Sequence, residues 1–259
     1  MIYLKNPEQI EKMRVAGEAL YEVLQKLREA IKPGETTGAL DVYAEQLIRK
    51  IGATPSFLNY HGYPASLCAS VDEQVVHGIP SDKVVLKEGS IISIDCGLVL
   101  DGWQADSAFT VGIGDISEDA ATLIKITEEC FWKGVRQAVN GNRLGDIGHA
   151  IQSYAEKNGC GVIRDLTGHG IGRAMHEDPT VFNFGEAGRG VRIKKGMALA
   201  IEPMICAGDW PVEELSDGWT YVTRDRSLCA HYEHTIAITE EGLPQILTLP
   251  GFKWEEEEA

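Results

Sequence analysis

The sequence contains no long apolar run and comparatively little positive charge. No stretch reaches the roughly 18–20 apolar residues that a membrane-spanning helix requires. Among the 259 residues, 24 lysines and arginines stand against 39 aspartates and glutamates, which gives a formal charge of −15. Such acidity argues against a protein that binds nucleic acid through a basic surface. Because the first residues also lack the features of a signal peptide, we expect a soluble, cytoplasmic protein without membrane or nucleic-acid partners.

Close cysteine pairs are also missing. The six cysteines are Cys68, Cys96, Cys130, Cys160, Cys206 and Cys229. No two of them form the C-x-x-C pair that is typical of a structural zinc site or a redox dithiol. We therefore predict reduced thiols that are buried or half-buried, as in a reducing compartment.

Helical and extended patterns alternate along the chain. Apolar spacing predicts helices over residues 6–31, 37–51, 118–139 and 144–157, of which the first begins at the N-cap Asn6. The strand pattern is densest over residues 84–111, and short strands are predicted over residues 197–201, 220–223 and 229–239. The order predicts an α+β fold of two similar halves. Because no linker-like segment interrupts it, we expect a single domain over residues 1–252 and a disordered acidic tail over residues 253–259.

Two aspartates lie in a predicted β-hairpin. An apolar strand ends in Asp95, where a buried acid is costly unless something pairs with it. A turn centred on residues 101–102 pairs Asp95 with Ala108. The same turn pairs Asp106 with Gly97, so the two acids become diagonal neighbours on one face, with Cα atoms about 7–8 Å apart. Two like charges this close need a cation or a shared proton.

Further acids and a histidine occur in similar positions downstream. Glu202 ends a second apolar strand directly before a proline, and Glu233 begins a third, where alternation places it on the same face as His231. His169 lies among glycines, which let the backbone approach another group closely. A proton-sharing acid dyad or one structural calcium would explain the first pair alone. The full set of four carboxylates and one imidazole favours two divalent first-row metals.

Eight segments of the chain resemble, in order, those of the type I methionine aminopeptidases, which are metal-dependent enzymes with the pita-bread fold. The resemblance extends from about residue 7 to about residue 250. The segments are residues 61–64, 77–80, 94–95 with 106–107, 168–172, 175–179, 201–204, 217–219 and 232–235. The resemblance implies an antiparallel sheet with flanking helices in two pseudo-symmetric halves.

The resemblance also implies a set of site residues. It implies two divalent ions (Co, Mn, Fe or Zn) and these ligands: Asp95, Asp106, His169, Glu202 and Glu233. His77 and His176 would contact the substrate and Glu202 would also move a proton, which makes these three the expected catalytic residues. The wall of the methionine pocket would consist of Tyr60, Tyr63, Cys68 and Trp219. Met175 and Phe57 depart from the pattern of many relatives and could alter this pocket.

The implied reaction is removal of the N-terminal methionine from nascent or short peptides. A free amino terminus would bind one ion, and a hydroxide held between the ions would attack the first peptide carbonyl. His176 would stabilise the oxyanion, and His77 would contact the peptide bond. The implied partners are nascent polypeptide N-termini, including those at the ribosome, and the implied state is a monomer.

Two alternatives differ in their sequence features. Xaa-Pro aminopeptidases and prolidases share the fold but usually carry a large N-terminal domain, whereas here the pattern starts close to Met1. Non-catalytic peptide-binding modules of this fold tend to lose metal ligands, and all five are present here. Type II methionine aminopeptidases carry a long insertion between the positions that match His176 and Glu202. In this chain the interval between these two residues is too short for such an insertion.

Overall fold

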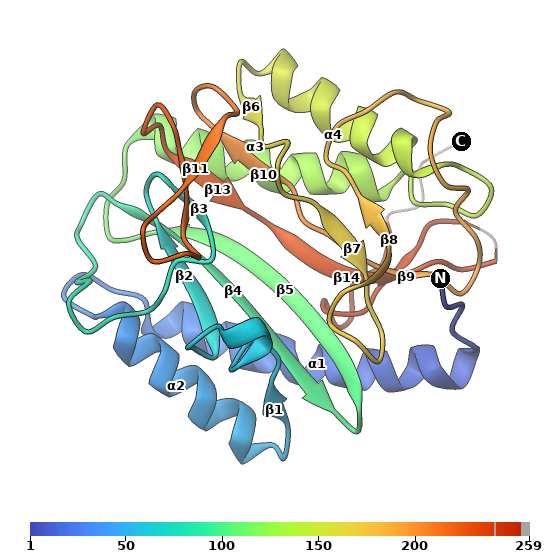
Figure 1. Cartoon of the computed structure of the whole chain (residues 1–259), viewed down its shortest axis with the longest axis horizontal. Helices are drawn as coiled ribbons and strands as arrows, with labels where there is room; N and C mark the ends of the chain where they lie inside the picture. The colour runs from blue at the N-terminus through green and yellow to red at the C-terminus, as the bar shows by residue number, and fades with distance from the viewer. Residues whose placement is uncertain (241, 255–259) are drawn as a thin grey trace.

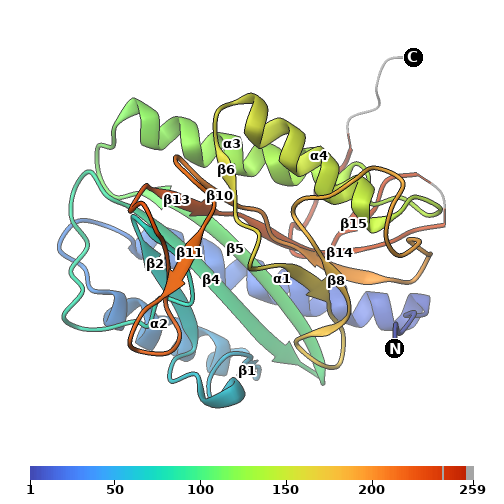
Figure 2. The ribbon, with the colours of Figure 1, turned by 45° about the horizontal axis from the view of Figure 1, so that its top comes forward.

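A central antiparallel sheet lies between two pairs of helices in the computed structural model, which describes residues 1–240 and 242–254 (Figure 1). The helices are α1 (Pro7–Ala30), α2 (Thr37–Lys50), α3 (Glu118–Val135) and α4 (Leu144–Lys157), with a short 3-10 helix at Tyr60–Gly62. Figure 2 shows α3 and α4 side by side on one side of the sheet, with α1 on the other. This arrangement confirms the predicted α+β fold of two helix-flanked halves.

Seven strands of the central sheet pair in the order β1-β4-β5-β14-β9-β7-β8, while β2 pairs with β4 and β15 with β14. Their bounds are β1 (Thr54–Pro55), β2 (Leu67–Val71), β4 (Ile91–Leu100), β5 (Trp103–Gly112), β7 (Gly168–Gly170), β8 (Glu177–Val181), β9 (Ala198–Ile201), β14 (Glu233–Ala237) and β15 (Gln245–Ile246). Two smaller sheets have the orders β13-β10-β6 and β11-β12-β3. Their bounds are β3 (Gln74–Val76), β6 (Gly161–Val162), β10 (Met204–Cys206), β11 (Val212–Glu214), β12 (Tyr221–Thr223) and β13 (Cys229–His231).

The start of α1 follows the predicted capping. The side chain of Asn6 accepts a hydrogen bond from the amide of Gln9 (2.9 Å), whose own side chain accepts one from the amide of Asn6 (3.0 Å). Pro7 occupies the first helical position, where a missing amide costs nothing. One face of α1, including Leu20 and Leu27, is fully buried in the core of the first half.

The third helix is shorter than its apolar pattern predicts. It ends at Val135 rather than at residue 139, because the amides of Gln137 and Ala138 bond to carbonyls only three residues back. The dense β-type region also begins later than predicted, since β4 starts at Ile91 and residues 84–90 contain only an isolated bridge from Val85 to Thr36 and a turn at residues 88–89. The hydrophobic core of the second half, formed by α3, α4 and the neighbouring strands, nevertheless includes the apolar residues on the inner faces of both helices.

The hairpin register agrees with the prediction. Asp95 lies opposite Ala108 and Gly97 lies opposite Asp106 in the β4–β5 ladder. The connecting turn has positive φ at Asp101 (50°) and at the following glycine (74°), as a two-residue hairpin turn requires. Both aspartates therefore project from the same face of the sheet.

The end of the described chain packs against the second half. Trp254 donates a hydrogen bond from Nε1 to the carbonyl of Pro244 (2.8 Å) and meets Trp132 edge to face. Of the expected acidic tail, residues 255–259 lie outside the described residues. The single-domain boundary remains a prediction. No described helix is long and apolar enough to cross a membrane.

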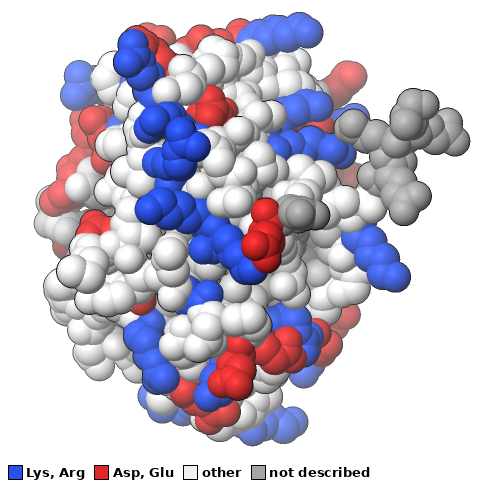
Figure 3. Space-filling model, turned by 90° about the vertical axis from the view of Figure 1, so that its right-hand side faces the viewer, with Lys and Arg blue, Asp and Glu red and all other residues white. Residues whose placement is uncertain are grey.

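The negative charge of the chain is not spread evenly over its surface. Figure 3 shows a face on which lysine and arginine side chains form a band, with acidic side chains beside it. A formal charge of −15 is therefore compatible with a locally basic surface, which the composition alone could not indicate. The six cysteines are all free, and five of them are buried, as predicted.

Candidate metal centre and adjoining pockets

Five adjacent strands each bring one of the predicted ligand residues to the same place. In sheet order, β4 carries Asp95, β5 carries Asp106, β14 carries Glu233, β9 leads directly into Glu202, and β7 carries His169. β9 ends before Pro203, which has no amide to donate to a ladder. Residues that are far apart in the chain thus converge because their strands are neighbours in the sheet.

The imidazole of His169 faces two of the carboxylates. Its Nε2 lies 3.7 Å from Oδ2 of Asp106 and 3.5 Å from Oε1 of Glu202. Its Nδ1 lies 2.8 Å from the carbonyl oxygen of Gly170, which can only accept a hydrogen bond. Nδ1 therefore carries the proton of the neutral ring, and the lone pair of Nε2 points toward the acids, as in metal-binding histidines.

Three carboxylate oxygens of the acidic cluster have no hydrogen-bond donor. Oδ1 of Asp95, Oδ1 of Asp106 and Oε1 of Glu233 are buried without a partner. In the described part of the chain, the ion-pair partners within 4.0 Å of these carboxylates are histidines only. Unpaired buried carboxylates are costly, so this arrangement fits bound cations.

Burial and mutual repulsion disfavour ionisation of these acids in the protein without ions. Burial raises the pKa of Asp95 well above its usual value, and repulsion from Asp106 adds to this effect. Burial raises the pKa of Asp106 to about 8. The pKa values of Glu202 and Glu233 are also raised well above normal, by burial first and by repulsion from Asp106 second. Divalent cations would neutralise the cluster and allow all four acids to ionise.

Two groups of side chains have the spacing needed to hold an ion, with ligand atoms within 4.8 Å of one another. The first contains Asp106, His169 and Glu233, and the second contains Glu202, His231 and Glu233. Oxygen-rich sets with an imidazole suit first-row divalent metals, so the residues fit the metal use that the sequence predicted.

His231 lies in this centre, although no role was predicted for it from the sequence. Its Nε2 is buried without a hydrogen-bond partner and lies 3.9 Å from Oε2 of Glu202 and 3.9 Å from Oε2 of Glu233. Strand alternation had placed it on the face of Glu233, which was the available signal. By contrast, His234 points away and contacts Ser107, Tyr232 and Thr248.

A cavity of about 210 Å³ adjoins the acids and contains the predicted pocket wall. Its lining includes Phe57, Tyr60, Tyr63, Cys68, Met175 and Trp219. The hydroxyl of Tyr63 donates to the carbonyls of Leu67 and Gly78, both at 3.1 Å, and its ring meets Trp219 edge to face. Burial raises the pKa of Cys68 well above normal, so its thiol remains protonated. The cavity is thus apolar, aromatic and sulfur-containing at the end away from the acids.

Both predicted substrate histidines line the centre. His176 stacks edge to face on His169 (4.3 Å between ring centres), and its Nδ1 lies 2.8 Å from the hydroxyl of Tyr60. Burial lowers the pKa of His176 to about 4, with repulsion from His169 adding to it, so the ring is neutral near pH 7. His77 lies beside Trp219 and also has a lowered pKa, chiefly because of burial.

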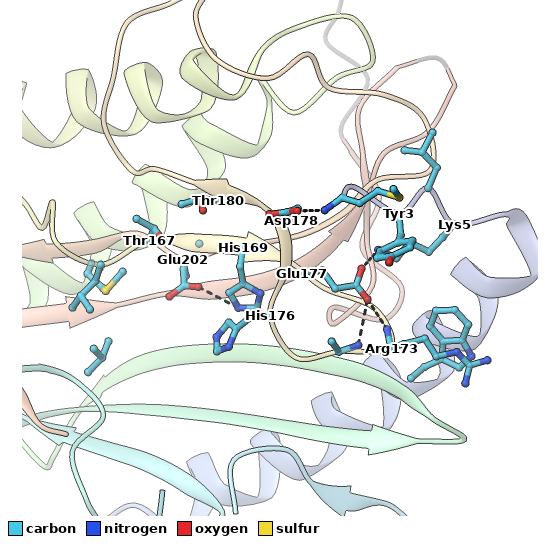
Figure 4. A pocket seen from close by; sticks show the side chains of 18 of the residues that line it. Tyr3, Lys5, Thr167, His169, Arg173, His176, Glu177, Asp178, Thr180 and Glu202 are labelled. Carbon is cyan, nitrogen blue, oxygen red and sulfur yellow. Dashed lines mark hydrogen bonds and ion pairs between the residues drawn. The ribbon is translucent and has the colours of Figure 1, made fainter. Parts of the chain in front are cut away.

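A second, larger cleft of about 1030 Å³ opens from the centre toward the N-terminus of the chain. Figure 4 shows His169, His176 and Glu202 on one side of the view, and Tyr3, Lys5 and Glu177 on the other. The chain's own first residues therefore form part of the cleft wall. No pattern in the sequence indicates the contact between Lys5 and Glu177, which joins residues more than 160 positions apart.

Comparisons with known proteins agree with this geometry. The model of metallopeptidase family M24 matches residues 11–240. A methionine aminopeptidase of Clostridium acetobutylicum is 56% identical over 249 residues, covering 96% of this chain and 99% of that protein. Methionine aminopeptidase 1 of Bacillus subtilis is 49% identical over 248 residues, covering 96% and 99%.

Solved structures show the same relationship. The methionine aminopeptidase of Rickettsia prowazekii superposes with a TM-score of 0.94 at 43% identity, covering 96% of this chain and all of that one. A prolidase of Pyrococcus horikoshii shares the fold with a TM-score of 0.77 at 22% identity, and 63% of its chain is covered. The chain belongs to the M24 family of metallopeptidases, and within it to the methionine aminopeptidases, which have the pita-bread fold.

Proposed function

We propose that this protein is a metal-dependent aminopeptidase that removes the N-terminal methionine from peptides, and that its site consists of the residues predicted from the sequence. The observation that carries the proposal is the convergence of five ligand residues from five adjacent strands at one end of a cavity whose other end is apolar and aromatic. The identity of 44–56% to methionine aminopeptidases over nearly the whole chain favours this activity over that of prolidases, which share only the fold.

In this proposal two divalent ions (Co, Mn, Fe or Zn) are held by Asp95, Asp106, His169, Glu202 and Glu233. When bound, the ions supply Lewis acidity and a hydroxide nucleophile at neutral pH. The unpartnered oxygens of Asp95, Asp106 and Glu233 support these residues as ligands. An unprotonated amino terminus would bind one of the ions, which restricts the substrate to peptides with a free N-terminus.

The methionine side chain would occupy the cavity of about 210 Å³, where Tyr60, Tyr63, Cys68 and Trp219 surround it. Aromatic rings and sulfur accommodate a flexible thioether well. Met175 and Phe57 are buried in the same wall and narrow this space.

Three side chains would act on the scissile bond. Glu202 moves a proton between the attacking water and the leaving nitrogen. In the tautomer of neutral His176 whose Nδ1 accepts from the Tyr60 hydroxyl, Nε2 carries the proton and donates a hydrogen bond to the developing oxyanion. His77, which lines both cavities beside the centre, contacts the peptide bond.

We further propose that the substrates are the N-termini of nascent chains, including those at the ribosome, and that the protein acts as a cytoplasmic monomer. The cleft of about 1030 Å³ supports a peptide substrate, because a chain that continues beyond its first residue needs an open path from the centre.

A pair of peptides tests the substrate assignment. With added Co²⁺ or Mn²⁺, the protein should release methionine from Met-Gly-Met-Met and leave Gly-Pro-Ala intact, as followed by chromatography of the products. The apolar cavity provides the reason, since it suits a thioether side chain. Cleavage of the proline peptide alone would instead assign a prolidase-like activity. Ion binding without cleavage of either peptide would favour a non-catalytic peptide-binding module.

A further inference from the structure

A buried ion pair links the N-terminal segment to the strand that follows His176. Nζ of Lys5 lies 2.6 Å from Oε2 of Glu177, and their side chains are only 4% and 7% exposed. By comparison, the Lys195–Glu240 pair has side chains that are 53% and 71% exposed. Removing one member of a buried pair leaves an unpaired charge, whereas an exposed pair contributes little. The Lys5–Glu177 pair is therefore one on which the local structure depends.

The second oxygen of Glu177 fixes the turn before it. Oε1 accepts hydrogen bonds from the amides of Arg173 (2.8 Å) and Ala174 (3.2 Å), as the dashed lines in Figure 4 indicate. Gly172 leaves space for this arrangement, because a Cβ at that position would lie 2.6 Å from both Oε1 of Glu177 and Cε of Lys5. One carboxylate thus holds the lysine and two backbone amides at once.

This turn carries side chains of the proposed active site. Met175 lines the methionine cavity, and His176 directly precedes Glu177. Glu177 also pairs with Gly170 in the β7–β8 ladder, next to His169. A shift of the Glu177 carboxylate would therefore move the backbone from which the His176 ring projects.

The other end of the pair is anchored to the body of the protein. The amide of Lys5 donates to the carbonyl of Gly196 (2.7 Å), just before β9. Lys5 also directly precedes Asn6, the residue that caps α1. The ammonium group of Lys5 thus has a fixed position, and its contact with Glu177 holds the turn before Glu177 in place.

We propose that the Lys5–Glu177 pair is a positioning device that sets His176 for catalysis. The inference rests on the proposed function, in which His176 donates to the oxyanion. Misplacement of a catalytic group by about 1 Å can cost about 10²-fold in rate. Because the oxyanion exists only in the transition state, the loss should fall on kcat and leave KM little changed.

The test is the substitution Lys5→Met, which keeps most of the length of the unbranched side chain and removes its charge. With Met-Gly-Met-Met as substrate, kcat should fall by about 10- to 100-fold while KM changes by less than about 3-fold. The affinity for Mn²⁺, measured by calorimetry, should remain that of the wild type. The matched control is Lys195→Met, which breaks the exposed pair with Glu240 and should alter none of these values.

A double variant separates positioning from general loss of structure. Adding Glu177→Gln to Lys5→Met removes the unpaired buried charge while keeping an oxygen for the amides of Arg173 and Ala174. Because the pair itself is still missing, we expect kcat to stay lowered at nearly constant KM, while Tm recovers relative to Lys5→Met as the unpaired buried charge is removed. If Lys5→Met does not fold, Lys5→Arg, which retains the charge but displaces it, should show the same loss in kcat at constant KM.

The proposal is overturned if kcat of Lys5→Met is unchanged, if the loss falls on KM or Mn²⁺ affinity, or if the double variant recovers the kcat of the wild type without the pair. These outcomes require an active wild type. A wild-type protein that cleaves no methionine peptide would contradict the proposed function instead, so the two failures are distinguishable.

Discussion

Replacing Asp106 with asparagine should abolish turnover and weaken metal binding. Asp106 is buried at the centre of the cluster, where its Oδ2 faces Nε2 of His169 and its carboxylate adjoins Asp95. An amide has nearly the same shape but provides no negative charge and only one oxygen ligand. Methionine release should fall by about 10³-fold or more, because the ions that activate the nucleophile are no longer held in place. Steady-state kinetics and metal analysis of the purified variant provide the measurement.

The control for this variant is Cys130→Ser. Cys130 lies in α3, is fully buried, and directs its thiol toward the carbonyl of Ile151 rather than toward the centre. Its replacement should leave turnover and metal content nearly normal. Near-normal turnover of the Asp106→Asn protein would show that the carboxylate cluster does not hold the catalytic ions.

The substitution His176→Ala should lower kcat by about 10²–10³-fold while the ions remain bound. This is the effect of removing one hydrogen-bond donor from a developing oxyanion. His176 touches His169 but belongs to neither group of candidate ligand residues. Metal content, measured by mass spectrometry, should therefore match that of the wild type while turnover falls.

His149→Ala is the matched control for His176→Ala. His149 is an exposed histidine on α4, close to Ser153, and lines neither of the two cavities at the centre. Its loss should not change kcat. An unchanged kcat in His176→Ala would remove the oxyanion role, and a loss of metal would assign His176 to the metal centre instead.

The central hairpin could be predicted from sequence because local rules fix its register. A two-residue turn with a glycine determines which residues face each other, and alternation then determines which share a face. Those rules placed Asp95 opposite Ala108 and Asp106 opposite Gly97, as the structure confirms. Capping determined the start of α1 in the same way.

Contacts between distant segments could not be predicted by such rules. The sequence gives no indication that Lys5 meets Glu177 or that Tyr60 meets His176, since each contact depends on how two loops pack. The predicted end of α3 was also wrong. Apolar periodicity continues through Ala138, although the backbone has already changed to tighter turns after Val135. Strand alternation alone places His231 on the same face as Glu233. Its position in the metal centre, however, also depends on Glu202, which the fold brings beside it.

The acidic cluster also makes the stability of the ion-free protein dependent on pH. A carboxyl group whose pKa is raised by folding stabilises the folded state below its unfolded pKa, near 4, and this contribution is lost as pH rises through the folded pKa. For Asp106 that folded pKa is about 8. The penalty thus grows between about pH 4 and pH 8, and cations that bind the ionised acids relieve it.

The most direct measurement is a titration of ion-free protein with Mn²⁺ or Co²⁺, with binding followed by calorimetry and Tm by thermal unfolding. Two ions per chain should bind at micromolar concentration or below. They should raise Tm, and by more at pH 8 than at pH 5, because more carboxylates are then ready to bind them. Failure of either cation to bind at micromolar concentration, or a Tm that does not respond to it at either pH, would contradict a metal centre at these five residues.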